Sequence, residues 1–176
     1  MNVRKLVILA MFLALGIVLP LVFHIGGPGL GKVFLPMHIP VLICGALMGP
    51  VAGLIIGIIT PVLNSLLTGM PPLFPNVPIM VVELAVYGLL TGYLYRKLNW
   101  NILAVLPVTM VIGRFAAGLT VWILVLVFGF DLQAANPLFY VWGTITAGIP
   151  GIIIQLGLIP LLVRYLENSV SEKVKI

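Results

Sequence analysis

The sequence consists largely of apolar runs of near membrane-spanning length, separated by clusters of glycine and proline. A helix needs about 20 mainly apolar residues to cross the roughly 30 Å hydrocarbon layer of a bilayer. Only 7% of the residues are charged, whereas an average soluble domain carries about 25%. The chain therefore lacks the polar side chains that a water-facing surface requires. We expect residues 1–176 to form a single all-α domain that is integral to the membrane.

Glycine and proline between the runs predict six transmembrane helices. Proline suits the first turn of a helix and disfavours helical geometry in the residue before it, so Gly49-Pro50 is expected to end one helix and begin another. The first run is too long for the apolar region of a secretory signal and lacks a small-residue cleavage site. The second helix is short for a crossing. The predicted helices cover about 4–23, 38–48, 51–68, 79–95, 101–128 and 138–164.

The basic residues orient this predicted bundle, because lysine and arginine in short loops gather on the cytoplasmic side. Six crossings from a cytoplasmic N-terminus leave Lys32 alone outside and Arg114 within a helix. The net charge of +5 then reflects orientation in the membrane and not a nucleic-acid-binding surface. Both termini are expected in the cytoplasm. Seven of the nine basic residues fall on the inner side: Arg4, Lys5, Arg96, Lys97, Arg164, Lys173 and Lys175.

Long connections are expected only on the outer side of the bundle, at 24–36, 69–78 and 129–137. They are rich in proline and glycine, whereas the inner connections are short. Long, stiffened loops gathered on one side are typical of a lid over a binding site. The alternative is that they are ordinary connections between helices.

Two ionisable residues, Glu83 and Arg114, lie inside the apolar runs. A charge near the centre of a bilayer costs several kcal/mol, so such residues usually have a function. One interpretation is that they pair with each other within the bundle. The other is that they face a cavity and bind a polar ligand, and a buried pair can do both. Tyr87 is one turn from Glu83 and shares its face of the helix.

Weaker candidates for substrate binding surround this pair. Asn64 equally suits a hydrogen bond to a neighbouring helix backbone. Trp142 also suits the aromatic belt expected at the membrane interface. His38 opens the second helix, where it equally suits a helix-end position. The weaker candidates are Lys32, His38, Asn64, Trp142 and Gln155.

The sequence contains no motif for catalysis, nucleotide binding or metal binding. We therefore expect no cofactor, no enzymatic activity and no ATPase of its own. The chain either assembles with itself or passes its solute to partners that supply energy. Ala10 and Ala14 share one face of the first helix, where small residues allow another helix to approach closely. Stripes of glycine at 49, 53 and 57 and at 88 and 92 suit internal packing or contact with another subunit.

These features resemble the substrate-binding S components of energy-coupling factor (ECF) vitamin transporters. The likeness covers nearly the whole chain and begins with an inside first helix bearing Ala10-x-x-x-Ala14. It is strongest in three stretches, which are Phe34 to Leu42 (FLPMHIPVL), Leu66 to Pro72 (LLTGMPP) and Glu83 to Gly88 (ELAVYG).

The resemblance implies a bundle of six helices that binds a vitamin with high affinity near the outer face. Such subunits associate with a transmembrane coupling subunit and two ATP-binding subunits in the prokaryotic plasma membrane. By this likeness Ala10 and Ala14 would contact the coupling subunit. The site would include Glu83, Tyr87, Arg114 and Gln155, closed by the loops at 24–36 and 69–78.

The Pro-Met-His-Ile-Pro stretch beginning at Pro36 looks most like members assigned to pantothenate. Pantothenate is a carboxylate, which Arg114, Lys32 or His38 would neutralise. Riboflavin is the main alternative and would require stacking on Trp142, Tyr140 or Tyr87. A different class of function is a self-assembling channel or facilitator, with the glycine stripes as subunit contacts and Arg114 lining a pore.

Overall fold

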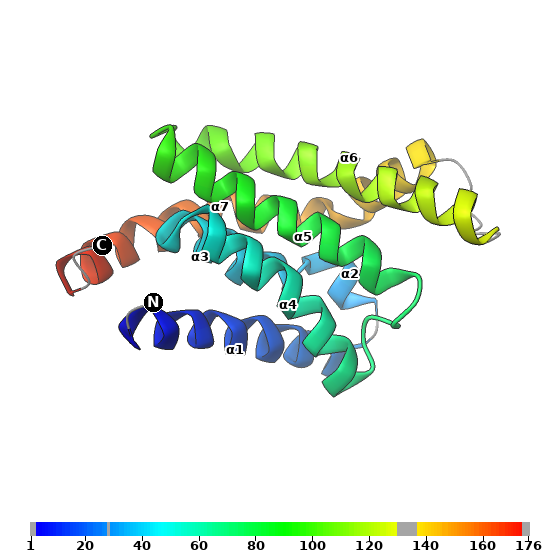
Figure 1. The fold of residues 1–176 in the computed structure, drawn as a ribbon, viewed down its shortest axis with the longest axis horizontal. Coiled ribbons are helices and arrows are strands. Elements are labelled where there is room, and N and C mark those ends of the chain that lie inside the picture. The colour runs from blue at the N-terminus through cyan, green and yellow to red at the C-terminus, as the bar shows by residue number, and fades with distance from the viewer. Residues whose placement is uncertain (1–2, 28, 130–136, 174–176) are drawn as a thin grey trace.

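The computed structural model describes residues 3–27, 29–129 and 137–173, and within them every regular element is helical (Figure 1). Six segments are long and apolar enough to cross a membrane, one of them formed by α2 and α3 together. The predicted all-α bundle of six membrane-spanning segments is thus confirmed. The helices are α1 (Val3–Ile25), α2 (Leu30–Phe34), α3 (His38–Met48), α4 (Pro50–Thr68), α5 (Asn76–Gly92), a π-helical turn η1 (Tyr93–Lys97), α6 (Ile102–Phe128) and α7 (Pro137–Lys173).

The structure differs from the prediction in two places. The first outer connection is not a loop throughout, because α2 forms within it and supplies the length that the short second helix lacks. The last helix continues to Lys173 instead of ending near residue 164. Its final turns are polar, so an apolar run could not reveal them. Most of the predicted loop at 129–137, and Lys175, lie outside the described residues.

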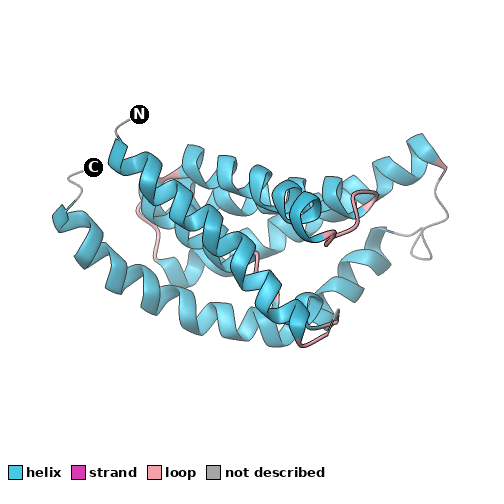
Figure 2. Ribbon diagram, turned by 90° about the horizontal axis from the view of Figure 1, so that it is seen from below, coloured by secondary structure: helices cyan, strands magenta, loops and turns pink. Residues whose placement is uncertain are grey.

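The helices form a bundle in which α1 and α6 lie at opposite edges, with α3, α4 and α5 between them (Figure 1). The last helix packs against α2, α3 and α6, and bends along the bundle, with Pro150 and Pro160 inside it (Figure 2). The start of α1 and the end of α7 lie at the same end of the bundle (Figure 1). This arrangement agrees with the orientation that the basic residues predict.

Arg96, one of the basic residues at the predicted inner end, also holds the end of α3. Its Nε donates a hydrogen bond to the carbonyl of Ala46 at 3.0 Å, and its Nη2 donates to that of Leu47. The last carbonyls of a helix have no partner within the helix, and a cation is favourable beside them. Nearby, the Tyr95 hydroxyl donates to Glu167 Oε2 at 2.8 Å and joins η1 to α7.

The glycine stripes bring α4 and α5 into backbone contact. A Cβ on Gly53 would meet the backbone of Gly88, and one on Gly57 would meet the backbone of Leu84. Gly92 faces the backbone of Gly49 and Pro50 in the same way. The stripes are therefore used for packing within the chain, where helices in a membrane approach closely through small residues.

We expect Gly88→Ala to destabilise the bundle by about 1–3 kcal/mol, because its methyl group would meet main-chain atoms of Gly53 that cannot move aside. Gly157→Ala on α7 is the control, since open space surrounds that position. The midpoint of thermal unfolding in detergent measures the difference. Equal midpoints for the two variants would contradict the close contact.

Candidate functional site

A buried ion pair joins α5 to α6. Arg114 Nη1 lies 2.9 Å from Glu83 Oε1, and the two residues are only 5% and 3% exposed. The pairing that the sequence left open is therefore present. Each charge offsets part of the cost of holding the other away from water.

Two further residues complete this polar cluster. His38, at the start of α3, places Nε2 3.5 Å from Glu83 Oε1. Tyr87 lies edge-on to His38, with ring centroids 5.1 Å apart, and its hydroxyl donates to the carbonyl of Met110 at 3.3 Å. All of these side chains are buried. The structure thus brings together four of the predicted site residues from three helices.

The cluster contains more hydrogen-bonding groups than the described residues satisfy. Arg114 Nε and Nη2 have no hydrogen-bond partner among them, and neither does His38 Nδ1. Since Nε–H and an Nη2 hydrogen share one edge of the guanidinium plane, Arg114 has one paired and one unpaired edge. Buried polar groups normally have partners, so unpaired ones need an explanation such as a ligand or ordered water. The unpaired edge suits a carboxylate, which such an edge can bind with two parallel hydrogen bonds.

Gln155 lies beside the cluster and fixes the turn between α2 and α3. Its Nε2 donates to the carbonyl of Leu35 at 3.2 Å, and this carbonyl also accepts from the backbone N–H of His38 at 3.1 Å. Gly151, one turn before Gln155, packs against the backbone of Val33 and Phe34. Gln155 therefore positions the segment that carries His38.

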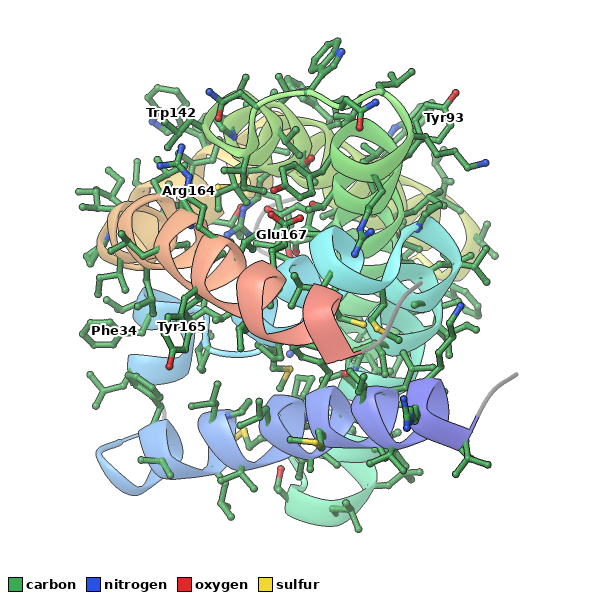
Figure 3. All side chains as sticks on the ribbon, turned by 90° about the vertical axis from the view of Figure 1, so that its left-hand side faces the viewer. Phe34, Tyr93, Trp142, Arg164, Tyr165 and Glu167 are labelled. Carbon is green, nitrogen blue, oxygen red and sulfur yellow. The ribbon has the colours of Figure 1, made fainter. Side chains whose placement is uncertain are left out.

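Three predicted binding residues do not join the cluster. Lys32 is exposed on α2. Trp142 is 69% exposed and lies on the outside of the bundle (Figure 3), as an aromatic residue at the membrane interface would. Asn64 is buried, but it contacts α1 instead.

The contact of Asn64 has a local cause in α1. Pro20 has no N–H, so the carbonyl of Gly16 loses its normal partner within the helix. Asn64 Nδ2 donates to this carbonyl at 2.8 Å and to the carbonyl of Thr60 at 3.0 Å. Asn64 thus makes a hydrogen bond to the backbone of a neighbouring helix, which was the alternative to substrate binding in the sequence analysis.

The two predicted partner-contact residues, Ala10 and Ala14, are both exposed on α1. The exposed apolar side chains of Val7 and Met11 adjoin them, whereas Leu9 and Phe12 are buried on the other side of the helix. The small residues therefore lie on a face that the rest of the chain leaves open.

The sequence did not identify three residues that shape the cluster. Gly113 makes room for the ring of Tyr87, since a Cβ there would collide with it. Leu35 adopts a left-handed backbone conformation with φ 51°, and Gly148 approaches both Leu35 and Arg114. The only available signal was that Gly113 directly precedes Arg114. The contacts themselves join helices far apart in the chain.

The comparison with protein families identifies this architecture. Residues 4–163 match the model of the ECF transporter, substrate-specific component family. The chain therefore belongs to that family, whose members are multi-pass membrane subunits that bind substrate and work with ECF energy-coupling components, a membrane subunit and ATPases. Comparisons with curated proteins and with solved structures gave no significant match.

Proposed function

We propose that this chain is the high-affinity substrate-binding subunit of an ECF-type importer in a prokaryotic plasma membrane, and that its substrate is pantothenate. The observation that carries the proposal is the buried Arg114, one edge of which is unpaired among the described residues. A carboxylate bound there would make two charge-assisted hydrogen bonds. The partners would be one transmembrane coupling subunit and two ATP-binding subunits, which supply the energy for transport.

The other members of the cluster suit the rest of this substrate. Pantothenate carries hydroxyl and amide groups beside its carboxylate. Glu83 is an acceptor for such donors, and His38 Nδ1, which makes no hydrogen bond to the described residues, offers a further acceptor or donor. Because Glu83 already contacts Arg114, it also holds the guanidinium in place before substrate arrives. A site held in this way loses little entropy on binding.

Two alternatives have less support from the arrangement of side chains. Riboflavin requires an aromatic surface, but Trp142 lies outside the cluster and Tyr140 packs with the apolar side chains of Ile79, Ala117 and Val121. Tyr87 lies within the cluster, but its ring is buried and already packs against His38. A self-assembling channel would use the glycine stripes as subunit contacts, yet these glycines already pack α4 against α5.

The proposal is tested with the purified chain and with the chain in vesicles. We expect it to bind pantothenate tightly, with one molecule per monomer, and to hydrolyse no ATP. In vesicles that contain this chain alone we expect no net uptake. Calorimetry, together with mass spectrometry of small molecules that co-purify, reports the ligand. Tight binding of riboflavin instead of pantothenate would show that the proposed substrate is wrong. Robust uptake by this chain alone would show that it is not a subunit that depends on energy-coupling partners.

A further inference from the structure

Asn64 on α4 fastens the middle of α1 to the bundle. Both hydrogens of its amide are used, because Nδ2 donates to the carbonyl of Gly16 at 2.8 Å and to that of Thr60 at 3.0 Å. Within α1 the Gly16 carbonyl lacks its usual N–H partner, since Pro20 stands four residues later. Asn64 is fully buried. A buried hydrogen bond therefore joins the two helices at a carbonyl that proline leaves free.

The two helices also approach closely at this point. A Cβ at Gly16 would lie 2.8 Å from Thr60 Cγ2 and 3.2 Å from Thr60 Oγ1. Phe12, Gly16 and Pro20 are spaced by four residues on one face of α1, and all three are buried. Apolar packing is non-directional, whereas a hydrogen bond weakens steeply when its angle changes. The Asn64 contact therefore restricts rotation of α1 about its own axis, which apolar packing on this face does not do alone.

The opposite face of α1 carries the small residues. Ala14 is two residues from Gly16 and so points to nearly the opposite side of the helix, and Ala10 lies one turn earlier on the same exposed face. On its other side α4 is held to α5, where Gly57 packs against the backbone of Leu84. The direction in which the two alanines face, relative to the rest of the bundle, is thus set through α4.

We infer that Asn64 is a positioning residue for the docking of the transmembrane coupling subunit, because its bond to Gly16 fixes the rotation of α1. The inference rests on the proposed function and deepens it, since it names what orients the surface that meets this partner. A partner helix approaches closely only on the side where small residues lie. A rotated α1 would present larger apolar side chains, such as that of Met11, in place of Ala10 and Ala14.

The first variant, Asn64→Leu, removes the hydrogen bond and keeps the branched shape of the side chain. We expect it to associate with the coupling subunit about tenfold more weakly, because fewer molecules hold α1 in the orientation that binds. Its pantothenate affinity should equal that of wild type, since Asn64 contacts only α1 and its own helix. Ser65→Ala is the control, because it removes a buried hydroxyl from α4 that has no hydrogen-bond partner among the described residues. Co-purification measures association, and vitamin uptake in vesicles that contain all subunits measures its consequence.

A second pair of variants separates positioning from the simple pairing of a buried carbonyl. Pro20→Ala supplies an N–H to which the Gly16 carbonyl can bond within α1, and it leaves Asn64 in place. This variant should associate as wild type does. Pro20→Ala/Asn64→Leu pairs the carbonyl but lacks the bond between the helices. We expect it to unfold near the wild-type temperature and still to associate about tenfold more weakly, and it gives this answer even if Asn64→Leu alone fails to fold.

The outcomes separate this inference from the proposed function. If Ala10→Leu/Ala14→Leu loses association and Asn64→Leu does not, the role of Asn64 is wrong and the docking face stands. If neither variant loses association, the docking face itself is wrong, and the inference falls with it. Association that returned together with stability in Pro20→Ala/Asn64→Leu would show that Asn64 only pairs a carbonyl. Loss of pantothenate binding with intact association would place Asn64 in the substrate site and would also overturn the inference.

Discussion

Replacing Arg114 by alanine is expected to weaken pantothenate binding by at least about 100-fold, because the substrate loses two charge-assisted hydrogen bonds of about 1.5–3 kcal/mol each. The substitution also leaves Glu83 buried at 3% exposure without its partner. Breaking a buried pair from one side costs about 3–5 kcal/mol of stability. Calorimetric titration in detergent measures the first effect, and thermal unfolding measures the second.

A double variant separates binding from stability. Glu83→Leu/Arg114→Met removes both charges and fills similar volumes with apolar groups, which is often neutral for stability. We expect it to unfold near the wild-type temperature and still to bind no pantothenate. If binding returned together with stability, the pair would serve the fold alone and the assigned site would be wrong. For the single variant Arg114→Ala, Arg164→Ala is the charge-matched control, since Arg164 is exposed on α7.

The sequence predicted the helices well because the bilayer imposes simple rules on them. Apolar length, proline at a helix start and basic residues at one end are all local signals, and they identified α1 and α3 to α7. Proline at position 50 begins α4 as its position predicts. The five-residue α2 was missed because Gly26-Gly27-Pro28-Gly29 before it is typical of a loop. The last turns of α7 were missed because they are polar and so do not extend the apolar run from which the helix was predicted.

The candidate site was predictable in part. Glu83 and Arg114 stand out because an ionisable residue in an apolar run is rare, and Tyr87 follows from the helical repeat. Which helix each polar side chain faces depends on packing, and the sequence does not encode this locally. Asn64 faces α1 because Pro20 frees a carbonyl there, a relation across 48 residues of sequence. The close approach of Gly148 to Arg114 depends likewise on a contact between α6 and α7.

Replacing both Ala10 and Ala14 by leucine is expected to abolish uptake by the complete transporter while sparing substrate binding. Both alanines are exposed on α1, so larger apolar side chains should meet only lipid in the isolated subunit. Against a partner helix, leucine would prevent the close approach that small residues permit. Overpacking typically costs about 1–3 kcal/mol per site, so two substitutions should weaken association by about 100-fold or more.

Glu83, Tyr87 and Arg114 lie in α5 and α6, neither of which packs extensively against α1. His38 lies in α3, which does pack against α1, but Ala10 and Ala14 are on the exposed face of α1. Pantothenate affinity of the purified Ala10→Leu/Ala14→Leu variant should therefore equal that of wild type. Co-purification with the coupling subunit and vitamin uptake in vesicles that contain all subunits measure the loss. Ala104→Leu is the matched control, because it adds the same volume at an exposed position on α6. Loss of binding with intact association would mean that α1 serves the substrate site, and would contradict its assignment as the docking face.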